Sequence, residues 1–212
     1  MIPTKKVLQF ITDGNSAEEI ISQIKEVIAG GCFWVQLRMK EFPDNAIEKV
    51  IEAVKPLTDE KGVTLIMNDR VDMASRYSLD GVHLGDDDMS VAEARNILGD
   101  KALIGVTANT FEDILLKSQE SVDYFGIGPY RYTTTKKNLK SVIGLQGYDY
   151  IVNAMKETGI DKPAVAIGGI MLEDVNDLME LGLWGVAVSG AITKASDRKE
   201  ATEKFMKVIE KF

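Results

Sequence analysis

Short apolar runs alternate with amphipathic helical patterns along the chain, and this alternation limits the folds that it can adopt. Several runs have apolar side chains on successive positions, which is typical of parallel strands that are covered on both faces. The expected strands are Val7–Thr12, Phe33–Leu37, Val63–Met67, Gly81–Gly85, Ala102–Val106, Tyr124–Gly128, Ala164–Ile167 and Gly185–Val188. Because a helical pattern follows each strand, the chain predicts an α/β fold with a parallel sheet.

The helical segments have recognisable starts and apolar faces. Ser16, Ser90 and Thr110 can each cap the N-terminus of a helix, because a side-chain oxygen accepts a hydrogen bond from a backbone N–H there. The remaining helices are expected with Ile47, Ile51 and Val54 on one face, at Val71–Tyr77, at Tyr148–Met155, at Leu172–Leu181, and from Asp197 to an apolar stripe that ends at Phe212.

Alternating strands and helices within 212 residues close most naturally into a barrel. We predict a single compact (β/α)8 TIM barrel that spans residues 1–212 as one domain, since no linker, repeat or low-complexity stretch interrupts the pattern. A doubly wound open sheet also fits the alternation. The glycine-rich ends of the seventh and eighth strands favour the barrel, because such barrels commonly bind phosphate there.

Composition narrows the class of protein. The net charge of -8 argues against a nucleic-acid partner, because such binding relies on positive charge. The single cysteine, Cys32, excludes an internal disulfide, suits a reducing compartment and is expected to be small and buried. No apolar stretch is long enough for a membrane span, and residues 1–6 lack the apolar core of a signal peptide. We expect a cytoplasmic protein with small-molecule partners, and leave a homo-oligomer open.

Polar residues collect at the C-terminal ends of the predicted strands. In a barrel these ends share one rim, which is the active-site face. Residues far apart in sequence are therefore expected to converge on one pocket. They are Gln36, Arg38, Lys40, Asn68, Asp69, His83, Asp88, Thr107, Thr133, Thr135, Lys136, Gly169 and Ser189.

Three groups among these residues suit anions. Arg38 and Lys40 lie two positions apart, so an extended strand end directs both to one face, where arginine can contact a diphosphate with two hydrogen bonds. Residues 133–137 offer three threonine hydroxyls and two ammonium groups, which can hold an oxygen-rich anion. Gly168 and Gly169 suit close approach of the backbone to a phosphate. Each group also has a simpler interpretation, as a solvated strand end, a loop or a tight turn.

The acidic residues suggest a metal. Asp69 and Asp88 could share a Mg²⁺ ion, which takes one or two carboxylates together with phosphate oxygens and water. Asp69 could instead cap the following helix, and the acidic turn at residues 86–88 could be solvated. His83, the only histidine, is either a hydrogen-bonded structural residue or part of the pocket. Two anion sites and a metal in one pocket suggest a transfer in which a diphosphate leaves.

Seven short motifs resemble those of the thiamine-phosphate synthase family and stand in the family's order. They are residues 36–40 (QLRMK), 67–70 (MNDR), 81–88 (GVHLGDDD), 126–129 (GIGP), 133–136 (TTTK), 167–170 (IGGI) and 187–192 (AVSGAI). Each motif is modest alone, but together they are specific and span nearly the whole chain. The resemblance implies a compact (β/α)8 enzyme, a Mg²⁺-dependent transferase of thiamine biosynthesis.

By this resemblance the enzyme would join hydroxymethylpyrimidine diphosphate to a thiazole phosphate in a dissociative reaction that releases pyrophosphate. The residues implied for the diphosphate are Arg38, Lys40 and Lys136, with Thr107 beside them. Those implied for Mg²⁺ are Asp69 and Asp88. Those implied for the pyrimidine are Gln36, Asn68 and His83. Those implied for the thiazole phosphate are Thr133, Thr135, Gly169, Ser189 and Gly190.

The chain departs from the family pattern at a few places. Thr107 stands where Ser is usual, Met39 where Glu is common, and Tyr132 where Pro is common. Ser189-Gly190 replaces an apolar residue followed by Ser, which moves the hydroxyl by one position. Two alternatives are a thiazole tautomerase and a non-catalytic sensor of a phosphorylated ligand. The complete set of implied diphosphate and metal residues argues against both.

Overall fold

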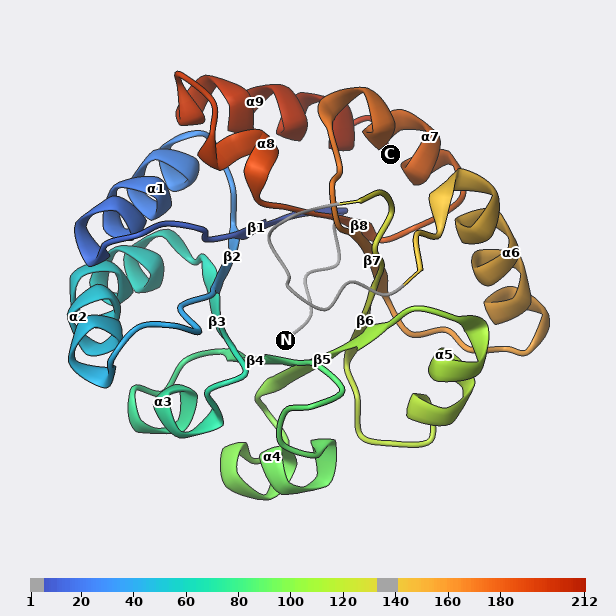
Figure 1. Ribbon diagram of the computed structural model, residues 1–212, viewed down its shortest axis with the longest axis horizontal. Helices are drawn as coiled ribbons and strands as arrows, with labels where there is room; N and C mark the ends of the chain where they lie inside the picture. Colours follow the sequence, from blue (N-terminus) through green and yellow to red (C-terminus); the bar gives the residue numbers. More distant parts are fainter. Residues whose placement is uncertain (1–5, 133–140) are drawn as a thin grey trace.

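A computed structural model describes residues 6–132 and 141–212 of the chain. Its strands are β1 (Val7–Ile11), β2 (Trp34–Leu37), β3 (Thr64–Asn68), β4 (Gly81–Leu84), β5 (Leu103–Ala108), β6 (Tyr124–Ile127), β7 (Ala164–Ile167) and β8 (Gly185–Val188). They form a closed barrel in chain order (Figure 1). β8 pairs with β1 in parallel, in a register that aligns Val7 with Gly185. This closure confirms the predicted TIM barrel and rules out the open sheet.

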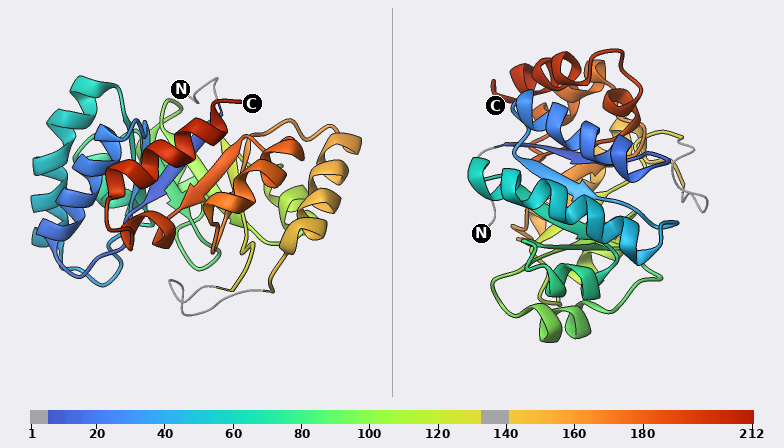
Figure 2. Two further views of the ribbon diagram at one scale, coloured as in Figure 1. Left: turned by 90° about the horizontal axis from the view of Figure 1, so that it is seen from above. Right: turned by 90° about the vertical axis from the view of Figure 1, so that its left-hand side faces the viewer.

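Helices surround the barrel as an outer ring (Figure 1), and side views show helices lying along the outside of the strands (Figure 2). They are α1 (Ala17–Ala29), α2 (Asp44–Lys61), α3 (Val71–Arg76), α4 (Val91–Leu98), α5 (Phe111–Lys117), α6 (Gly144–Glu157), α7 (Val175–Glu180), α8 (Gly190–Thr193) and α9 (Arg198–Ile209), with a 3₁₀ turn η1 (Leu172–Asp174) before α7. The predicted caps are confirmed, since Ser16, Ser90 and Thr110 each accept a hydrogen bond from a backbone N–H of the first helical turn. Within the described part of the chain, none of the helices combines the length and apolar character that crossing a membrane requires.

Several boundaries differ from the predicted ones. β3 and β5 extend beyond their expected ends, so Asn68 and Thr107 lie within strands. α6 begins at Gly144 rather than at Tyr148, which shortens the preceding loop. The expected helix at Leu172–Leu181 is divided into η1 and α7, and the four-residue helix α8 was not predicted because it is too short to show a helical period. That residues 1–212 form one domain stays a prediction.

Apolar layers cover both faces of the barrel wall. The outer layer lies between strands and helices and includes Leu8 and Phe10 of β1. The inner layer fills the barrel and consists of Val7, Ile11, Trp34, Ile66, Leu103, Tyr124, Val165 and Ala187. The Trp34 ring is fully buried, with its centroid 5.0 Å from that of Tyr124 and 4.9 Å from that of Trp184. Successive residues of a strand thus face opposite layers, as the uniformly apolar runs predicted.

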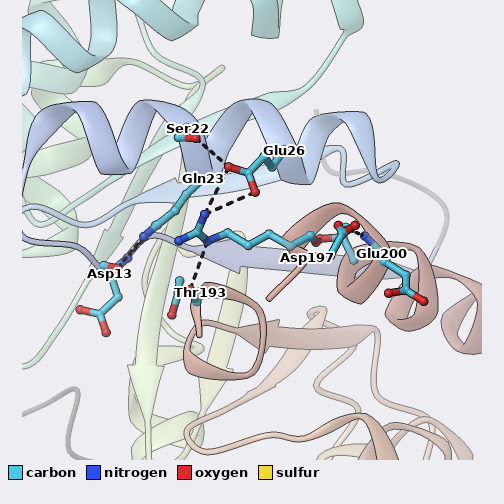
Figure 3. A network of polar contacts seen from close by, with 9 residues as sticks. Asp13, Ser22, Gln23, Glu26, Thr193, Asp197 and Glu200 are labelled. Atoms are coloured by element: carbon cyan, nitrogen blue, oxygen red, sulfur yellow. Dashed lines mark hydrogen bonds and ion pairs between the residues drawn. The ribbon is translucent and has the colours of Figure 1, made fainter. Parts of the chain in front are cut away.

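The ring of helices closes between α1 and α9, where Arg198 of α9 contacts both α1 and α8. Figure 3 shows its partners Glu26 and Thr193. Its Nη1 donates to Glu26 Oε1 of α1 at 3.2 Å, and its Nε donates to the carbonyl oxygen of Thr193 in α8 at 3.1 Å. On the same helix α1, Gln23 Nε2 donates to the carbonyl oxygen of Asp13 at 2.8 Å. These contacts fix the segments that follow β1 and β8, both of which border the C-terminal rim.

Gly105 of β5 leaves room inside the barrel for the ring of Tyr124. A Cβ at this position would lie 2.0 Å from Tyr124 Cζ. We expect Gly105→Ala to lower the free energy of unfolding by about 3 kcal/mol, because overpacking a core forces side chains or strands to move. Urea unfolding measures the change. As a control, Gly62→Ala meets no atom within 4 Å and is opposed only by its left-handed backbone, so it should cost about 1 kcal/mol. Equal costs would contradict the steric argument.

Candidate active site

Inward-facing side chains change from apolar to polar toward the C-terminal rim. On β2, Trp34 of the inner layer is followed two residues later by Gln36, and on β3, Ile66 is followed in the same way by Asn68. Gln36 is 1% exposed and Asn68 is 9% exposed, so these polar groups are buried. The same change near the rim brings in His83, Thr107 and Ser189. The polar residues predicted for the site therefore begin where the inner apolar layer ends.

Lys40, Asp69 and Asp88 form a cluster of charges just beyond β2, β3 and β4. Lys40 Nζ lies 3.1 Å from Asp69 Oδ2 and 3.5 Å from Asp88 Oδ1. The side chains of the two aspartates are 16% and 15% exposed, whereas that of Lys40 is 40% exposed. The structure thus brings together three residues that the sequence assigned to one site.

The backbone of Asp69 has a φ of 59°, in the left-handed region that residues other than glycine seldom adopt. Its N–H donates to the carbonyl oxygen of His83 at 3.0 Å, and its own carbonyl oxygen accepts from the N–H of Val71 at 2.9 Å. The N-cap residue of α3 is Arg70, so the interpretation of Asp69 as a helix cap is wrong. A strained backbone that directs a carboxylate toward the Lys40 ammonium, which Asp88 also contacts, is typical of a functional site.

Asp88 is oriented by its second carboxylate oxygen. Oδ2 accepts a hydrogen bond from the N–H of Gly85 at 2.6 Å, while Oδ1 faces Lys40. Its neighbour Asp86 is directed to Lys117 of α5 instead, and the Lys117 ammonium also donates to the carbonyl oxygen of Thr107 at 2.6 Å. Asp88 is therefore the residue of this acidic turn that contacts the Lys40 ammonium together with Asp69.

The charge cluster fits a magnesium ion bound together with a phosphorylated ligand. Burial lowers the pKa of Lys40, but its hydrogen bond to Asp69 and the charges of both carboxylates outweigh burial and raise the pKa overall. Two carboxylates that already share one cation are also a donor set for Mg²⁺, when phosphate oxygens and water complete its shell. Within residues 6–132 and 141–212, no group of three or more His, Cys, Asp or Glu side chains is placed to hold a metal alone.

The turn after β7 has a backbone that requires glycine. Gly168 and Gly169 have φ of 95° and 71°, and a Cβ on Gly169 would lie 2.4 Å from Arg131 Cγ. The Arg131 guanidinium donates to both carboxylate oxygens of Asp174 at 2.7 and 2.8 Å and to the carbonyl oxygen of Gly169 at 3.1 Å. Arg131 thus fixes the loop after β6 against the turn after β7. Neither Arg131 nor Asp174 was predicted, because no sequence spacing links residues that far apart.

Two of the predicted site residues carry buried polar atoms with no hydrogen bond in the described part of the chain. They are Asn68 Nδ2 and Ser189 Oγ. A buried donor without a partner costs about 1–3 kcal/mol, so such an atom in a native fold usually meets water or a ligand. Both residues stand at the C-terminal ends of their strands, near the rim.

The structure describes some of the other predicted site residues and leaves others out. Gln36, His83 and Thr107 belong to a chain of buried hydrogen bonds that continues through Gln9 and Tyr124. Gln9 and Tyr124 were not predicted, since each lies in a run that reads as apolar. A polar residue at an inward strand position is the signal that could have identified Gln9.

Two further predicted residues have a described position. Arg38 follows β2, and its N–H donates to Thr12 Oγ1 at 2.8 Å, whereas Gly190 begins α8. Thr133, Thr135 and Lys136 lie outside the described residues, so their place at the site stays a prediction.

The sequence matches the family model described as thiamine monophosphate synthase over residues 8–192. The chain belongs to this family. A thiamine-phosphate synthase of Bacteroides fragilis is 47% identical over 201 residues, which cover 95% of this chain and 98% of that protein. One of Pyrococcus horikoshii is 38% identical over 206 residues, which cover 97% of this chain and 96% of that protein. A solved structure, the thiamine phosphate pyrophosphorylase of Pyrococcus furiosus, has a TM-score of 0.84 at 31% identity and covers 97% of this chain and 96% of its own.

Family membership confirms the resemblance inferred from the seven motifs. The thiamine monophosphate synthase family match includes all of the strands except the first residue of β1, and it includes all the candidate site residues. The chain is accordingly an enzyme, a transferase of thiamine biosynthesis. Its cytoplasmic location and homo-oligomeric state stay predictions.

Two substitutions at Asp69 separate its charge from its backbone. Asp69→Asn removes the charge that faces Lys40 but keeps a short polar side chain that tolerates left-handed backbone. Asp69→Ala removes the same charge and tolerates this backbone less well. We expect Asp69→Ala to be less stable than Asp69→Asn by about 1 kcal/mol in urea unfolding followed by circular dichroism. Equal stability of the two variants would show that residue 69 carries no backbone strain.

Proposed function

We propose that the enzyme joins hydroxymethylpyrimidine diphosphate to a thiazole phosphate, forming thiamine phosphate and releasing pyrophosphate. The observation that carries the proposal is the cluster in which the Lys40 ammonium contacts the carboxylates of both Asp69 and Asp88 at the rim. A lysine and two carboxylates around one point suit a diphosphate held with a divalent cation, which a monophosphate site does not need. Membership of the thiamine monophosphate synthase family supports the same reaction.

Arg38, Lys40 and Lys136 would hold the diphosphate, with the Thr107 hydroxyl beside them. In the structure, the Lys40 ammonium is balanced by the two aspartates. An incoming diphosphate offers this ammonium a partner with several charged oxygens, while arginine can contact such a group with two parallel hydrogen bonds. Because the chain carries a net charge of -8, this local positive charge is needed to attract an anion.

Asp69 and Asp88 would hold Mg²⁺. When bound, Mg²⁺ would supply positive charge that stabilises the departing pyrophosphate. The two carboxylates are held for this role by the left-handed backbone of Asp69 and by the hydrogen bond from the N–H of Gly85 to Asp88. Lys40 would then turn from the carboxylates to the diphosphate, which its longer and more exposed side chain permits.

The two halves of the rim would hold the two substrates. Gln36, Asn68 and His83 would surround the pyrimidine. Asn68 Nδ2, which has no hydrogen-bond partner within residues 6–132 and 141–212, needs an acceptor that a pyrimidine ring nitrogen provides. The unpaired Ser189 Oγ can likewise donate to a phosphate oxygen. The set proposed for the thiazole phosphate is Gly169, Ser189 and Gly190, together with Thr133 and Thr135.

The enzyme would act by positioning and electrostatics rather than through a covalent intermediate. Its one cysteine is no nucleophile, because burial raises the pKa of Cys32 to about 11. In the proposed reaction the C–O bond to the diphosphate breaks and its electron pair leaves with pyrophosphate. The thiazole nitrogen then gives its lone pair to the pyrimidine-methyl cation, forming the new C–N bond. Arg38 and Lys40 would stabilise the charge that develops on the leaving group, and a closed pocket would keep water from the cation.

The role of Arg38 can be measured by pyrophosphate release from the two substrates together. We expect Arg38→Ala to lower kcat/KM by roughly 10²–10³-fold, about 3–4 kcal/mol of transition-state stabilisation. Arg76→Ala is the control, because Arg76 pairs with Glu48 on the outer side of the helix ring and should change the rate by less than about twofold. An Arg38 variant as active as the control would remove Arg38 from the mechanism. A wild-type enzyme that releases no pyrophosphate would refute the reaction.

The metal role is tested by chelation and by two neighbouring aspartates. We expect EDTA to abolish turnover and added Mg²⁺ to restore it. Asp88→Asn keeps an oxygen that can accept from Gly85 but removes the charge, so it should raise the Mg²⁺ concentration for half-maximal rate at least about tenfold. Asp86→Asn, whose native carboxylate faces Lys117, is the matched control and should leave this concentration unchanged. Full activity after verified removal of metal would rule out the role of both carboxylates.

A further inference from the structure

A chain of buried hydrogen bonds crosses the inside of the barrel below the rim. Gln36 Nε2 donates to Gln9 Oε1 at 3.4 Å, and Gln9 Nε2 donates to the Tyr124 hydroxyl at 3.1 Å. The Tyr124 hydroxyl lies 2.9 Å from His83 Nδ1, and His83 Nε2 lies 3.1 Å from Thr107 Oγ1. Its members come from β1, β2, β4, β5 and β6. Gln36, Gln9, Tyr124 and His83 are each at most 5% exposed.

Two glycines in the barrel wall make room for this chain. A Cβ on Gly105 would lie 2.5 Å from the Tyr124 hydroxyl oxygen, and a Cβ on Gly126 would lie 2.7 Å from His83 Cε1. Gly105 is the register partner of both His83 and Tyr124. The two rings therefore occupy space that side chains on β5 and β6 would otherwise fill, so the polar chain is part of how the barrel packs.

The hydrogens in such a chain can run in either of two directions. If the Gln9 amide nitrogen faces Tyr124, the single hydroxyl hydrogen of Tyr124 goes to His83 Nδ1, and the imidazole hydrogen lies on Nε2 and goes to Thr107. If the amide is reversed, every bond reverses, and the imidazole hydrogen lies on Nδ1. In the structure Gln9 Oε1 faces Gln36 Nε2 and Gln9 Nε2 faces Tyr124, which is the arrangement of the first direction.

We propose that Gln9 is a positioning residue that sets the direction of this chain and so holds His83 as the neutral tautomer with its hydrogen on Nε2. Tyr124 can transmit the direction because burial raises the pKa of its hydroxyl, which stays protonated and donates one hydrogen bond. The chain of hydrogen bonds ends at Thr107. In the first direction Thr107 Oγ1 accepts a hydrogen bond from His83 Nε2, so the Thr107 hydroxyl hydrogen can be donated to another acceptor.

The consequence for catalysis rests on the proposed function. If Thr107 lies beside the diphosphate, the forward direction presents a hydroxyl hydrogen to an anionic oxygen, which is a favourable charge-assisted hydrogen bond. In the reverse direction the same hydroxyl would donate inward to His83 and present only lone pairs to the anion. Gln9, deep in the barrel, would thereby decide whether a side chain at the rim attracts or repels the leaving group.

The tautomer can be observed directly, because His83 is the only histidine of the chain. In full-length protein labelled with ¹⁵N-histidine and free of ligand, the protonated and unprotonated ring nitrogens have well-separated chemical shifts, and couplings to the ring C–H groups tell Nδ1 from Nε2. We expect the hydrogen on Nε2 in the wild type. Gln9→Met keeps a similar volume without the amide, and we expect it to give a mixture of the two tautomers. A hydrogen on Nδ1, or on both nitrogens, in the wild type would overturn the proposal, and so would an unchanged spectrum in Gln9→Met.

Gln23→Met is the matched control. Gln23 is also a fully buried glutamine, but its amide bonds the backbone of Asp13 outside the polar chain. Its loss should leave the His83 spectrum as in the wild type. If Gln23→Met produced the same mixture, loss of stability rather than loss of the Gln9 amide would explain the result, and the proposal would fall.

The catalytic consequence has its own measurement. In the pyrophosphate-release assay we expect Gln9→Met to lower kcat roughly tenfold, while the KM for the thiazole phosphate changes less than about twofold. A change confined to KM would overturn the step through Thr107. The spectra are recorded without substrates, so a tautomer result stands even if the wild type proves to catalyse another reaction, and the two failures can be told apart.

Discussion

The pairing of β8 with β1 is the constraint on which the rest of the structure depends. Closure gives the sheet an inside, and the two-residue repeat of a strand then assigns alternate side chains to it. A polar residue placed two positions beyond a buried apolar one must therefore arrive one layer nearer the rim, as Gln36 does after Trp34 and Asn68 does after Ile66. The polar face at the rim thus arises because the inward-facing positions of a strand change from apolar to polar residues. The backbone of the barrel stays regular.

The charge cluster divides into a fixed part and an adaptable part. The carboxylates of Asp69 and Asp88 are short, mostly buried and held by the backbone, one through its left-handed conformation and one through the N–H of Gly85. Lys40 is more exposed and has a long flexible side chain. The Lys40 ammonium neutralises the two carboxylates in the structure, and a bound anion would compete with them for it. The geometry therefore supports an exchange of partners at a site whose acidic groups stay in place.

The fold was predictable because the signal repeats: buried runs and capped helices recur from Val7 to the C-terminal helix. The positions of Asn68 and Thr107 followed from strand ends, even though β3 and β5 end one and two residues later than expected and so include them. The bond between Gln9 and Tyr124 was not predictable, since it joins residues 115 positions apart that share only an inward direction in the closed barrel. The left-handed backbone of Asp69 was not predicted, for another reason. An aspartate before a helix is commonly its cap, and the competing geometry depends on contacts with β4.

The structural cost of this site lies mostly at the rim, where binding can recover it. Among the residues that the structure describes, Asn68 Nδ2 and Ser189 Oγ are buried without hydrogen-bond partners. A ligand that accepts their hydrogens would recover the free energy that their desolvation costs. Trp34 Nε1 is likewise buried without a hydrogen-bond partner in the described part of the chain, but Tyr124 and Trp184 pack against its ring inside the apolar layer. The same kind of defect thus has two meanings. In the inner layer it is a lasting cost that packing of the aromatic rings offsets, whereas at the rim a bound ligand that accepts the hydrogen would recover it.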